Sequence, residues 1–370
     1  MIKPIPQEVQ NLLSALFSGN KEIRLRAAKV LGEIGNSSAV PILIEAFGDK
    51  DRDLRLTAVS ALKKFGPEAK SAVSVLIAAL MNEDEDICTA SADALESIGP
   101  EAEAAVPALI EVLKDKGPYA KKQTAVALGK IGSGALPALS EALKSEDVEF
   151  RKTVLRALGE IGTKAVPTLI KALKDDDRWV RQGVAQHLSK IGAEAVPALS
   201  EALKDLNTSV RESAAYSLKE IGAAAEVAVP ALLHALNDDI KVVRELATET
   251  LGYISSAANE IVPALVKALQ HKDRSERCQA AMALSSIGPM AKAAVPALSE
   301  AVKDDDYMVR HRAAIALGEI GSDARTAVPA LIEMLKDEVQ WLRDSAWDAL
   351  EKINTPEALK ALEEYKQNSS

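Results

Sequence analysis

The sequence predicts an all-α protein: a right-handed α–α superhelix of about eleven helical hairpins, followed by a C-terminal capping helix. The first observation is an Ile-Gly-like pair that recurs every 30–33 residues along all 370 residues. It begins at Ile34, Phe65, Ile98, Ile131, Ile161, Ile191, Ile221, Ile254, Ile287, Ile320 and Ile353. A fixed period of this length is typical of solenoids, in which each repeat packs only on its neighbours. No stretch has the composition of a linker, so we expect one continuous solenoid over residues 1–370.

The second observation is the apolar spacing within a repeat, which predicts two helices, A and B. In the repeat Gly162–Ile191, Pro167 suits the first turn of helix A because proline lacks an N–H that this turn would leave unpaired. The aspartate run 175–177 ends helix A and supplies an N-cap for helix B. One apolar stripe then follows helix B at Val180, Val184, Ala185, Leu188 and Ile191. Gly192 permits the left-handed residue that closes helix B.

We expect the B helices to end near the repeating Ile and a capping helix at about residues 356–367, with a first helix from about Pro6 to Phe17. The 33-residue repeats carry three further residues between the closing Gly and the Val-Pro of helix A. In the repeat that begins at Gly99, Pro100 can then open helix A one turn early. Pro107 would lie inside that helix and kink it.

The third observation is the composition, which bounds the function. Aromatic residues make up only 3% of the chain, so small and aliphatic side chains must form a thin core. The formal net charge of −9 argues against a dedicated nucleic-acid binder. Cys88 and Cys278 lie in different repeats and are not expected to pair. With no apolar leader or 18-residue apolar run, we expect a cytoplasmic monomer without a membrane segment.

An arginine recurs ten residues before the repeating Ile. This position holds Arg24, Arg55, Cys88, Lys121, Arg151, Arg181, Arg211, Arg244, Arg277, Arg310 and Arg343. An acid or amide lies four residues earlier in most repeats, at Asn20, Asp51, Asp84, Asp147, Asp177, Asn207, Asp273 and Asp306. Such a ladder could bind phosphate. Because nine of the eleven repeats have this arginine in the same place, we favour a structural ladder that ties each repeat to the next loop.

These patterns resemble the HEAT-like repeats of the phycobilisome-lyase (PBS lyase) type, an armadillo-type fold. Val309–Gly321 and Ala327–Asp337 match that pattern closely, and the resemblance extends from about Pro6 to Leu362. It implies a scaffold or adaptor, although a few members are bilin lyases or the di-iron enzyme deoxyhypusine hydroxylase. The hydroxylase needs His-Glu pairs. None of the four histidines here (His187, His234, His271 and His311) is followed by Glu, so that activity does not carry over.

A partner would contact side chains nine, five and one residues before each closing Ile, where the B helices are expected to line the concave face. The middle repeats are basic there, and the next two are acidic with tyrosines. The later repeats carry less charge and include Met282 and Ile315. Large side chains also recur twelve residues before the Ile, as possible anchors or as covers of the loops between repeats. The candidate partner-binding residues are Tyr119, Lys122, Lys130, Lys152, Arg156, Trp179, Gln182, Gln186, Lys190, Glu212, Tyr216, Glu245, Glu249, Tyr253, Met282, His311, Ile315 and Trp341. The charge blocks could equally serve only solubility.

The sequence contains no Gly-rich phosphate loop, no Cys-x-x-Cys and no His-x-x-x-His. We therefore expect no cofactor, and we favour a non-catalytic scaffold that binds a protein partner along the concave face. The alternative is a lyase- or chaperone-like protein that handles a tetrapyrrole or metal cofactor for its partner. Nucleic-acid binding through the basic repeats is a third hypothesis.

Overall fold

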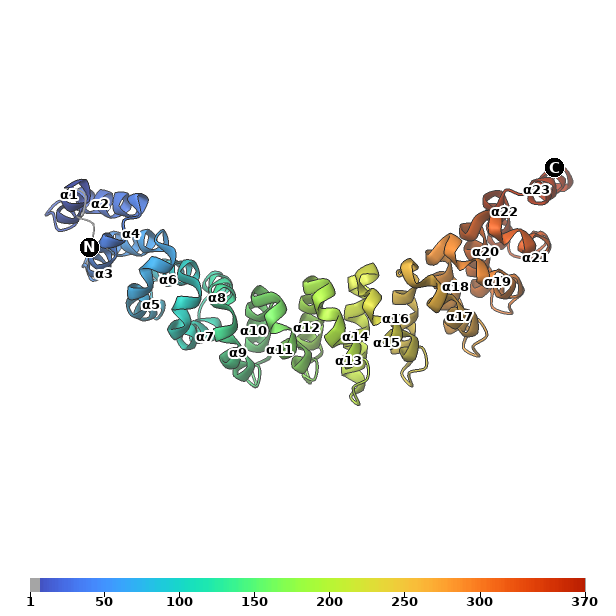
Figure 1. The fold of residues 1–370 in the computed structure, drawn as a ribbon, viewed down its shortest axis with the longest axis horizontal. Helices are drawn as coiled ribbons and strands as arrows, with labels where there is room; N and C mark the ends of the chain where they lie inside the picture. Colours follow the sequence, from blue (N-terminus) through green and yellow to red (C-terminus); the bar gives the residue numbers. More distant parts are fainter. Residues whose placement is uncertain (1–6, 370) are drawn as a thin grey trace. The chain divides into compact units, whose positions relative to one another are not determined.

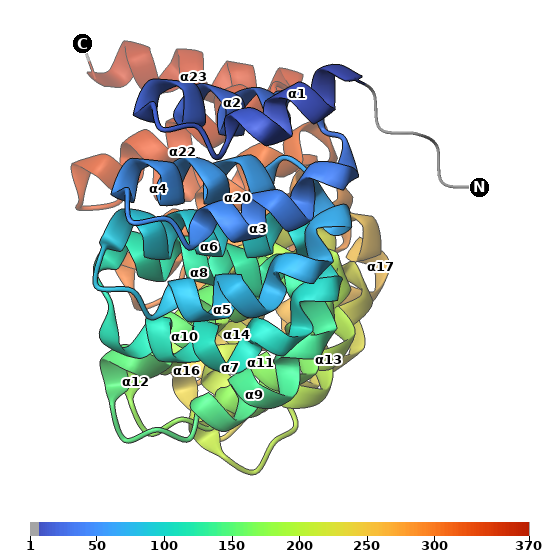
Figure 2. The same cartoon turned by 90° about the vertical axis from the view of Figure 1, so that its left-hand side faces the viewer.

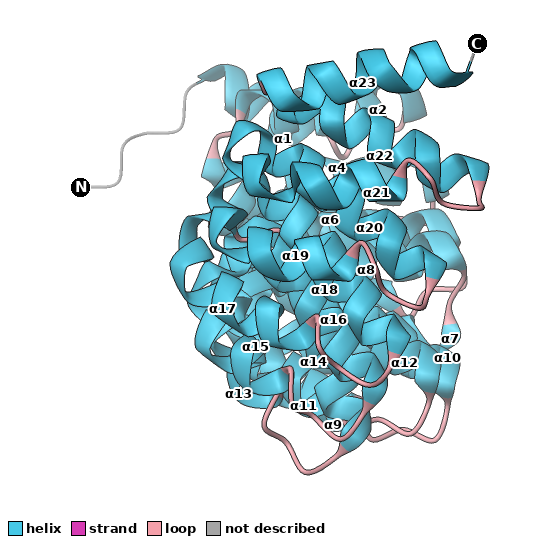
Figure 3. Cartoon of the chain, turned by 90° about the vertical axis from the view of Figure 1, so that its right-hand side faces the viewer, coloured by secondary structure: helices cyan, strands magenta, loops and turns pink. Residues whose placement is uncertain are grey.

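The computed structural model describes residues 7–369, and every regular element in that range is a helix (Figure 3). The chain forms two compact units, unit 1 (Met1–Ile191) and unit 2 (Gly192–Ser370). Each unit is a stack of helix pairs. This confirms the predicted all-α solenoid, while the prediction of a single continuous solenoid over residues 1–370 stays a prediction.

Unit 1 contains six helix pairs, each with its A helix first (Figure 1). The pairs are α1 (Gln7–Ala15) with α2 (Lys21–Ile34), α3 (Val40–Phe47) with α4 (Arg52–Lys63), α5 (Val73–Leu80) with α6 (Glu85–Ile98), α7 (Val106–Asp115) with α8 (Pro118–Ile131), α9 (Leu136–Ala142) with α10 (Val148–Ile161), and α11 (Val166–Ala172) with α12 (Arg178–Ile191). Within this unit the A helices form one layer and the B helices another (Figure 2).

Unit 2 contains five further pairs and a last helix, again in two layers. The pairs are α13 (Val196–Ala202) with α14 (Thr208–Ile221), α15 (Val229–Ala235) with α16 (Lys241–Gly252), α17 (Ala258–Ala268) with α18 (Arg274–Ile287), α19 (Val295–Ala301) with α20 (Tyr307–Ile320), and α21 (Val328–Met334) with α22 (Gln340–Ile353), followed by α23 (Pro356–Ser369). The eleven pairs and the terminal helix agree with the sequence. The first predicted helix is α1, and Pro6 lies outside the described residues.

The predicted kinked A helix is wrong for the repeat that begins at Gly99. A 3₁₀ segment, η3 (Gly99–Ala105), takes up the three further residues, and the backbone departs from helical angles at Ala102. The α-helix α7 starts afterwards, with Pro107 in its first turn. Proline is tolerated there because no hydrogen bond is lost, so the chain begins a new helix instead of bending an old one. Pro263 differs from Pro107, because it lies inside the helix α17 and not in its first turn.

The B helices end where their closing residue can adopt a positive φ. Gly162 does so after α10, with φ 72°. Two B helices end earlier than predicted, α4 at Lys63 and α16 at Gly252. After α16 the position of the closing glycine is taken by Ser255, for which a left-handed conformation is costly. The chain leaves the helix instead, and Ile254 has φ −104° and ψ 72°.

Neighbouring B helices approach closely because small residues lie where they touch. A Cβ added to Gly32 of α2 would lie 2.9 Å from the Cα of Ala61 in α4. In unit 2, a Cβ on Gly318 of α20 would lie 3.1 Å from the Cα of Ala349 in α22. Leu31, Leu62 and Leu317 are fully buried beside these contacts. The core is therefore a thin apolar seam that each pair completes only with its neighbours.

Polar contacts tie neighbouring loops together in the register predicted for the arginines. The Nη1 group of Arg151 donates to the carbonyl of Ser145, 2.8 Å away, in the loop of its own repeat. Its Nε and Nη2 groups donate to the two oxygens of Asp175 in the next loop, at 2.8 and 2.9 Å. Both side chains are 9% exposed. In unit 2 the same bridge joins Arg211 to Asp238, Arg277 to Asp304, and Arg310 to Asp337.

Most of the acids that the arginines bind are not those that the sequence pattern singled out, although Arg24 lies 3.8 Å from Asp51, which the pattern includes. Asp177, four residues before its arginine, caps α12 by accepting from the N–H groups of Trp179 and Val180 at 2.8 and 3.0 Å. The partner acid lies two residues earlier in the loop, at Asp175. In the loop that precedes α18 this position holds His271, and Arg244 binds Glu276 instead, at 2.8 Å. Arg181 and Arg343 also donate to loop carbonyls, at 2.7 and 2.6 Å.

One segment of unit 2, Arg274–Ala301, is long and apolar enough to cross a membrane by length and composition. It comprises α18, a 3₁₀ segment η9 (Gly288–Ala294) and α19, and its backbone turns at Gly288, where φ is 64°. Half of its apolar window is buried against other helices. Buried core helices pass the same test, so this segment is weak evidence for a membrane span.

Replacing Asp175 by Ala would strand the nearly buried guanidinium of Arg151. Removing one partner of such a pair costs about 3 kcal/mol, and in a solenoid the loss should be local. We expect faster amide hydrogen exchange in α10 and α12 of D175A, with exchange in α2 and α4 unchanged. The matched control is Asp176→Ala, because this neighbouring side chain is exposed. Equal exchange in the two variants would contradict the structural role of the bridge.

Candidate functional site

The predicted stripe of the B helices is accessible in the structure. We call it the B face, defined as the side chains nine, five and one residues before each closing Ile. From α8 to α20 none of these side chains is buried, whereas the core positions between them are, apart from the half-buried His187. Within each unit the A helices pack on the opposite side of the B helices. Whether the B face is concave stays a prediction.

Unpaired cations cover the B face of α8, α10 and α12 in unit 1. Lys122 and Lys130 of α8, Arg156 of α10 and Lys190 of α12 are exposed. Within residues 7–369 none of these four side chains forms an ion pair or a hydrogen bond. Lys152 differs, because its Nζ lies 2.8 Å from Glu149. Gln182 and Gln186 continue the surface on α12, and we call all seven residues the basic surface.

The basic surface lies in a protein whose overall net charge is negative. Unit 1 has 26 Lys and Arg against 26 Asp and Glu, and unit 2 has 19 against 28, so unit 2 accounts for the whole net charge of −9. Between Pro118 and Ile191 there are 13 basic residues against 8 acidic ones. The repeats that carry the basic surface are therefore positive in an acidic protein.

Two open cavities lie at the carboxyl ends of these helices. One, of about 570 Å³, is lined by Lys130, Ser133, Thr163 and Lys164 together with Gly129 and Gly132. The other, of about 270 Å³, is lined by Glu160, Thr163, His187 and Lys190 together with Gly159 and Gly162. The 3₁₀ connectors here, η4 (Gly132–Ala135) and η5 (Gly162–Ala165), have four residues, whereas η3 has seven. Both cavities border these shorter connectors, through Ser133 of η4 and Thr163 of η5.

His187 of α12 is half-buried and packs over Gly159 of α10, where any side chain would collide with its ring. Burial lowers the pKa of His187 below its ordinary value of 6.5, and the charges of Lys190 and Arg156 lower it further. The ring is therefore neutral at pH 7. It adds a polar edge to the smaller cavity without adding a charge.

The acidic part of the predicted stripe, in unit 2, is largely occupied by contacts within the protein. Glu245 accepts from the hydroxyl of Ser275 at 2.7 Å and lies 3.8 Å from Lys241. Glu249 accepts from the hydroxyl of Tyr253 at 3.0 Å and lies 3.5 Å from Lys219. Glu212 and Tyr216 are half-exposed on α14. The structure thus leaves most of the basic side chains of the stripe unpaired and pairs most of the acidic ones.

The less charged end of the stripe, in unit 2, includes a cluster of aromatic rings on α20 and α22. His311 shares a hydrogen bond of 2.8 Å with the hydroxyl of Ser345. The ring of Trp341 stands edge-to-face against His311 and Tyr307, with centroids 4.9 and 5.8 Å away. A cavity of about 240 Å³ beside it includes Ile315 in its lining. Met282, on α18, is half-exposed. Tyr307 was missed from the sequence because it lies one position before the predicted row of large side chains.

The remaining large side chains of that row differ in their surroundings. Tyr119 is 65% exposed and Trp179 is 59% exposed, so neither is covered by a loop. The guanidinium carbon of Arg178 lies 5.6 Å from the centre of the Trp179 ring. Trp341 packs against the neighbouring repeat instead. Tyr119 and Trp179 are therefore the two aromatic side chains that the structure leaves available beside the basic surface.

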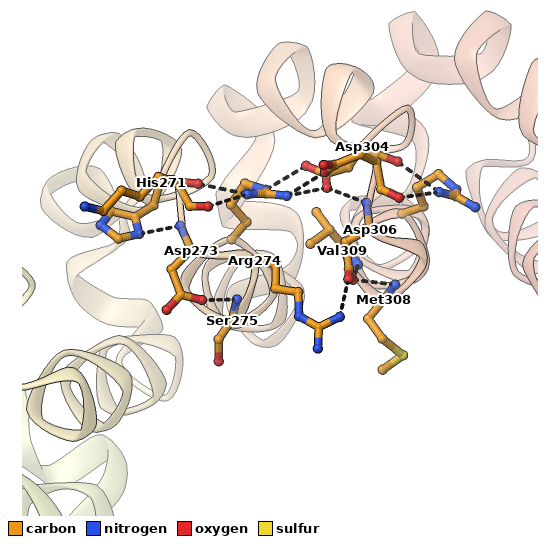
Figure 4. Close-up of polar contacts among 12 residues, drawn as sticks. His271, Asp273, Arg274, Ser275, Asp304, Asp306, Met308 and Val309 are labelled. Atoms are coloured by element: carbon orange, nitrogen blue, oxygen red, sulfur yellow. Dashed lines mark hydrogen bonds and ion pairs between the residues drawn. The ribbon is translucent and has the colours of Figure 1, made fainter.

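The aspartate-rich loops serve as helix caps and ion-pair partners. Asp306 accepts from the N–H groups of Met308 and Val309 at 2.9 and 3.3 Å, and from Arg274 at 2.9 Å (Figure 4). Hydrogen bonds to these donors hold the pKa of Asp306 below its usual value, although burial acts in the opposite direction and is the largest single effect. Within residues 7–369 no group of three His, Cys, Asp or Glu side chains is arranged to hold a metal ion.

Comparison with known sequences assigns the family. The pattern of HEAT repeats matches residues 9–96, 73–149, 136–219, 193–252, 229–310 and 295–370. The chain belongs to the HEAT repeat family. The match is to HEAT repeats in general, so the resemblance to the PBS lyase type stays a prediction. No curated protein sequence matches the chain.

Solved structures with a similar fold include the karyopherin Kap121p. Kap121p bound to the SUMO protease Ulp1p has a TM-score of 0.56 at 16% identity, over 97% of this chain and 46% of that one. Kap121p bound to the extreme C-terminus of the phosphatase Cdc14p gives 0.55 at 15% identity, over 98% and 47%. An engineered protein gives 0.39 at 24% identity, over 95% and 100%. The chain thus spans about half the length of these karyopherin chains, and at such identities the likeness concerns the fold alone.

The pKa of His187 reports on the cations around it. Below pH 6.5 the unfolded chain binds a proton at this histidine that the folded protein resists, so stability should fall as the pH drops from 6.5 towards the folded-state pKa. We expect the Lys190→Gln variant to have a higher His187 pKa than the parent, measured by NMR titration of the ring proton. Lys171→Gln is the control, because this exposed lysine lies on helix α11. An unchanged His187 pKa in K190Q would contradict the described site.

Proposed function

We propose that this protein is a non-catalytic scaffold that binds a segment of a partner protein along the B face, as a monomer in the cytoplasm. The observation that carries the proposal is the set of unpaired, exposed cations on α8, α10 and α12. Holding like charges together without counter-ions is unfavourable for the free protein. A partner that supplies those counter-ions would recover this cost on binding.

The repeat architecture supports a binding role. Stacked helix pairs present equivalent side chains at regular intervals, which suits an extended ligand better than a compact small molecule. Tyr119 and Trp179 supply large exposed aromatic surfaces of the kind that anchor protein interfaces. The structures of Kap121p with Ulp1p and with a segment of Cdc14p add an analogy, in which the same fold binds other proteins.

A photo-crosslinking amino acid at Gln186 would test this function. Gln186 is exposed on the B face, and its side chain forms no hydrogen bond within the described residues. We expect irradiation in cells to attach one identifiable protein there, and the purified partner to bind the purified full-length chain. The same amino acid at Lys171, on an A helix of the same repeat, should give no such adduct.

Two results would contradict the proposal. The first is a partner attached at Lys171 and absent at Gln186, which would place binding on the A helices. The second is the absence of any protein adduct at Gln186 and at further B-face positions such as Gln182 and Lys130.

A further inference from the structure

Three of the unpaired cations lie on one diagonal across three helices. Lys122 is nine residues before the end of α8, Arg156 five before the end of α10, and Lys190 one before the end of α12. Successive members are therefore 34 residues apart in the sequence. Because α8, α10 and α12 stack side by side, each step moves one helix across and four residues along. We call these three residues the cation diagonal.

The spacing of the cation diagonal follows from helix geometry. Four residues advance the chain by about 6 Å along the axis, and packed helices lie about 9 Å apart. Neighbouring members should thus be separated by about 11 Å at their backbones. An extended polyproline II segment turns once in three residues and rises about 3.1 Å for each. It presents every third side chain on one side, about 9 Å apart, and long Lys and Arg side chains can bridge the difference.

We propose that the cation diagonal binds an extended acidic segment of the partner, with Asp or Glu side chains three residues apart. This inference rests on the proposed scaffold function and specifies the chemistry of the partner. Each carboxylate of the segment pairs with one of Lys122, Arg156 and Lys190. Arg156, at the centre, can bind its carboxylate through two parallel hydrogen bonds.

The two ends of the cation diagonal differ in what lies beside them. Tyr119 precedes Lys122 by three residues, so the two side chains share one side of α8. Because Tyr119 is 65% exposed, an apolar residue next to the first acid can pack on its ring. At the other end, Lys190 lines the smaller cavity with Thr163 and His187. The last carboxylate can therefore receive further hydrogen bonds there.

The surroundings favour a protein over a nucleic acid. Glu160 is exposed between Lys130 and Lys190 along the ends of the helices, and Glu149 already pairs with Lys152. A nucleic-acid strand carries one phosphate for about each 3.4 Å of helix axis. It would hold roughly three charges for every cation of the diagonal and would pass close to the two glutamates. An acidic peptide can place neutral residues opposite both.

The test uses the full-length chain and three fluorescent peptides of equal length. The first has an apolar residue followed by Glu at every third position, the second has the same composition with its Glu residues contiguous, and the third has Gln for Glu. Anisotropy at low salt should show the first peptide binding at least about fivefold more tightly than the second, no binding of the third, and weaker binding as salt rises. A single-stranded oligonucleotide of equal charge should bind more weakly than the first peptide.

Variants locate the binding. We expect Arg156→Glu to weaken the first peptide about tenfold, and Arg156→Glu with Lys190→Glu to weaken it about a hundredfold. Lys171→Glu makes the same charge change on an A helix and should have an effect of less than twofold. Arg156→Gln, a milder variant, should reduce affinity by a smaller factor and keeps the test informative if R156E does not fold.

Three results would overturn the inference. They are no binding of the spaced peptide at low salt, equal losses in R156E and K171E, and tighter binding of the oligonucleotide. If the crosslink at Gln186 still identifies a protein partner, the scaffold function survives and only the chemistry assigned to the segment fails. If the spaced peptide does not bind and the crosslink at Gln186 identifies no protein, the proposed scaffold function is wrong as well.

Discussion

The constraint on which the rest depends is that no helix pair can bury its apolar side alone. Each B helix must therefore lie against the next, and small residues set how closely. Gly32 against Ala61 in unit 1 leaves no room for a larger side chain, and Gly318 against Ala349 in unit 2 leaves very little. This contact fixes the register of neighbouring B helices. Residues at equivalent repeat positions then become neighbours in space.

Register explains both the stability and the candidate binding surface. On the loop side it brings several arginines to an aspartate of the next loop, as Arg151 and Asp175 show. On the B face it places Lys122, Arg156 and Lys190 on three adjoining helices. The two sets of cations differ in whether the protein itself supplies their hydrogen-bond and ion-pair partners. The loop arginines are satisfied by carboxylates and carbonyls of the protein, whereas the three cations of the diagonal have none within the described residues. This surface is distinguished by exposed cations that lie at regular repeat spacing and have no counter-ion in the part of the chain that the structure describes.

The sequence predicted those features that depend on one repeat alone. The helix pairs, the capping by Asp177 and the exposure of the stripe follow from apolar period and local backbone chemistry. It did not predict features that depend on distances between repeats. The sequence analysis predicted that the arginines bridge to the next loop but named no acid for Arg151, although an acid 24 residues after this arginine, and 27 after Arg211, was visible in the sequence. The pairing of Glu245 and Glu249 required knowledge of which neighbours their carboxylates reach. The cavities depend on which side chains of neighbouring repeats meet beside the connectors η4 and η5.

The register of α8, α10 and α12 can be measured directly by electron–electron distance spectroscopy. Spin labels at Lys122 and Gln182 would occupy the same repeat position two helices apart, with Cys88 and Cys278 replaced. Packed helices lie about 9 Å apart, so we predict one narrow distance distribution centred near about 20 Å. A broad distribution, or one centred beyond about 35 Å, would show that these helices do not stack in register, and the cation diagonal would not exist.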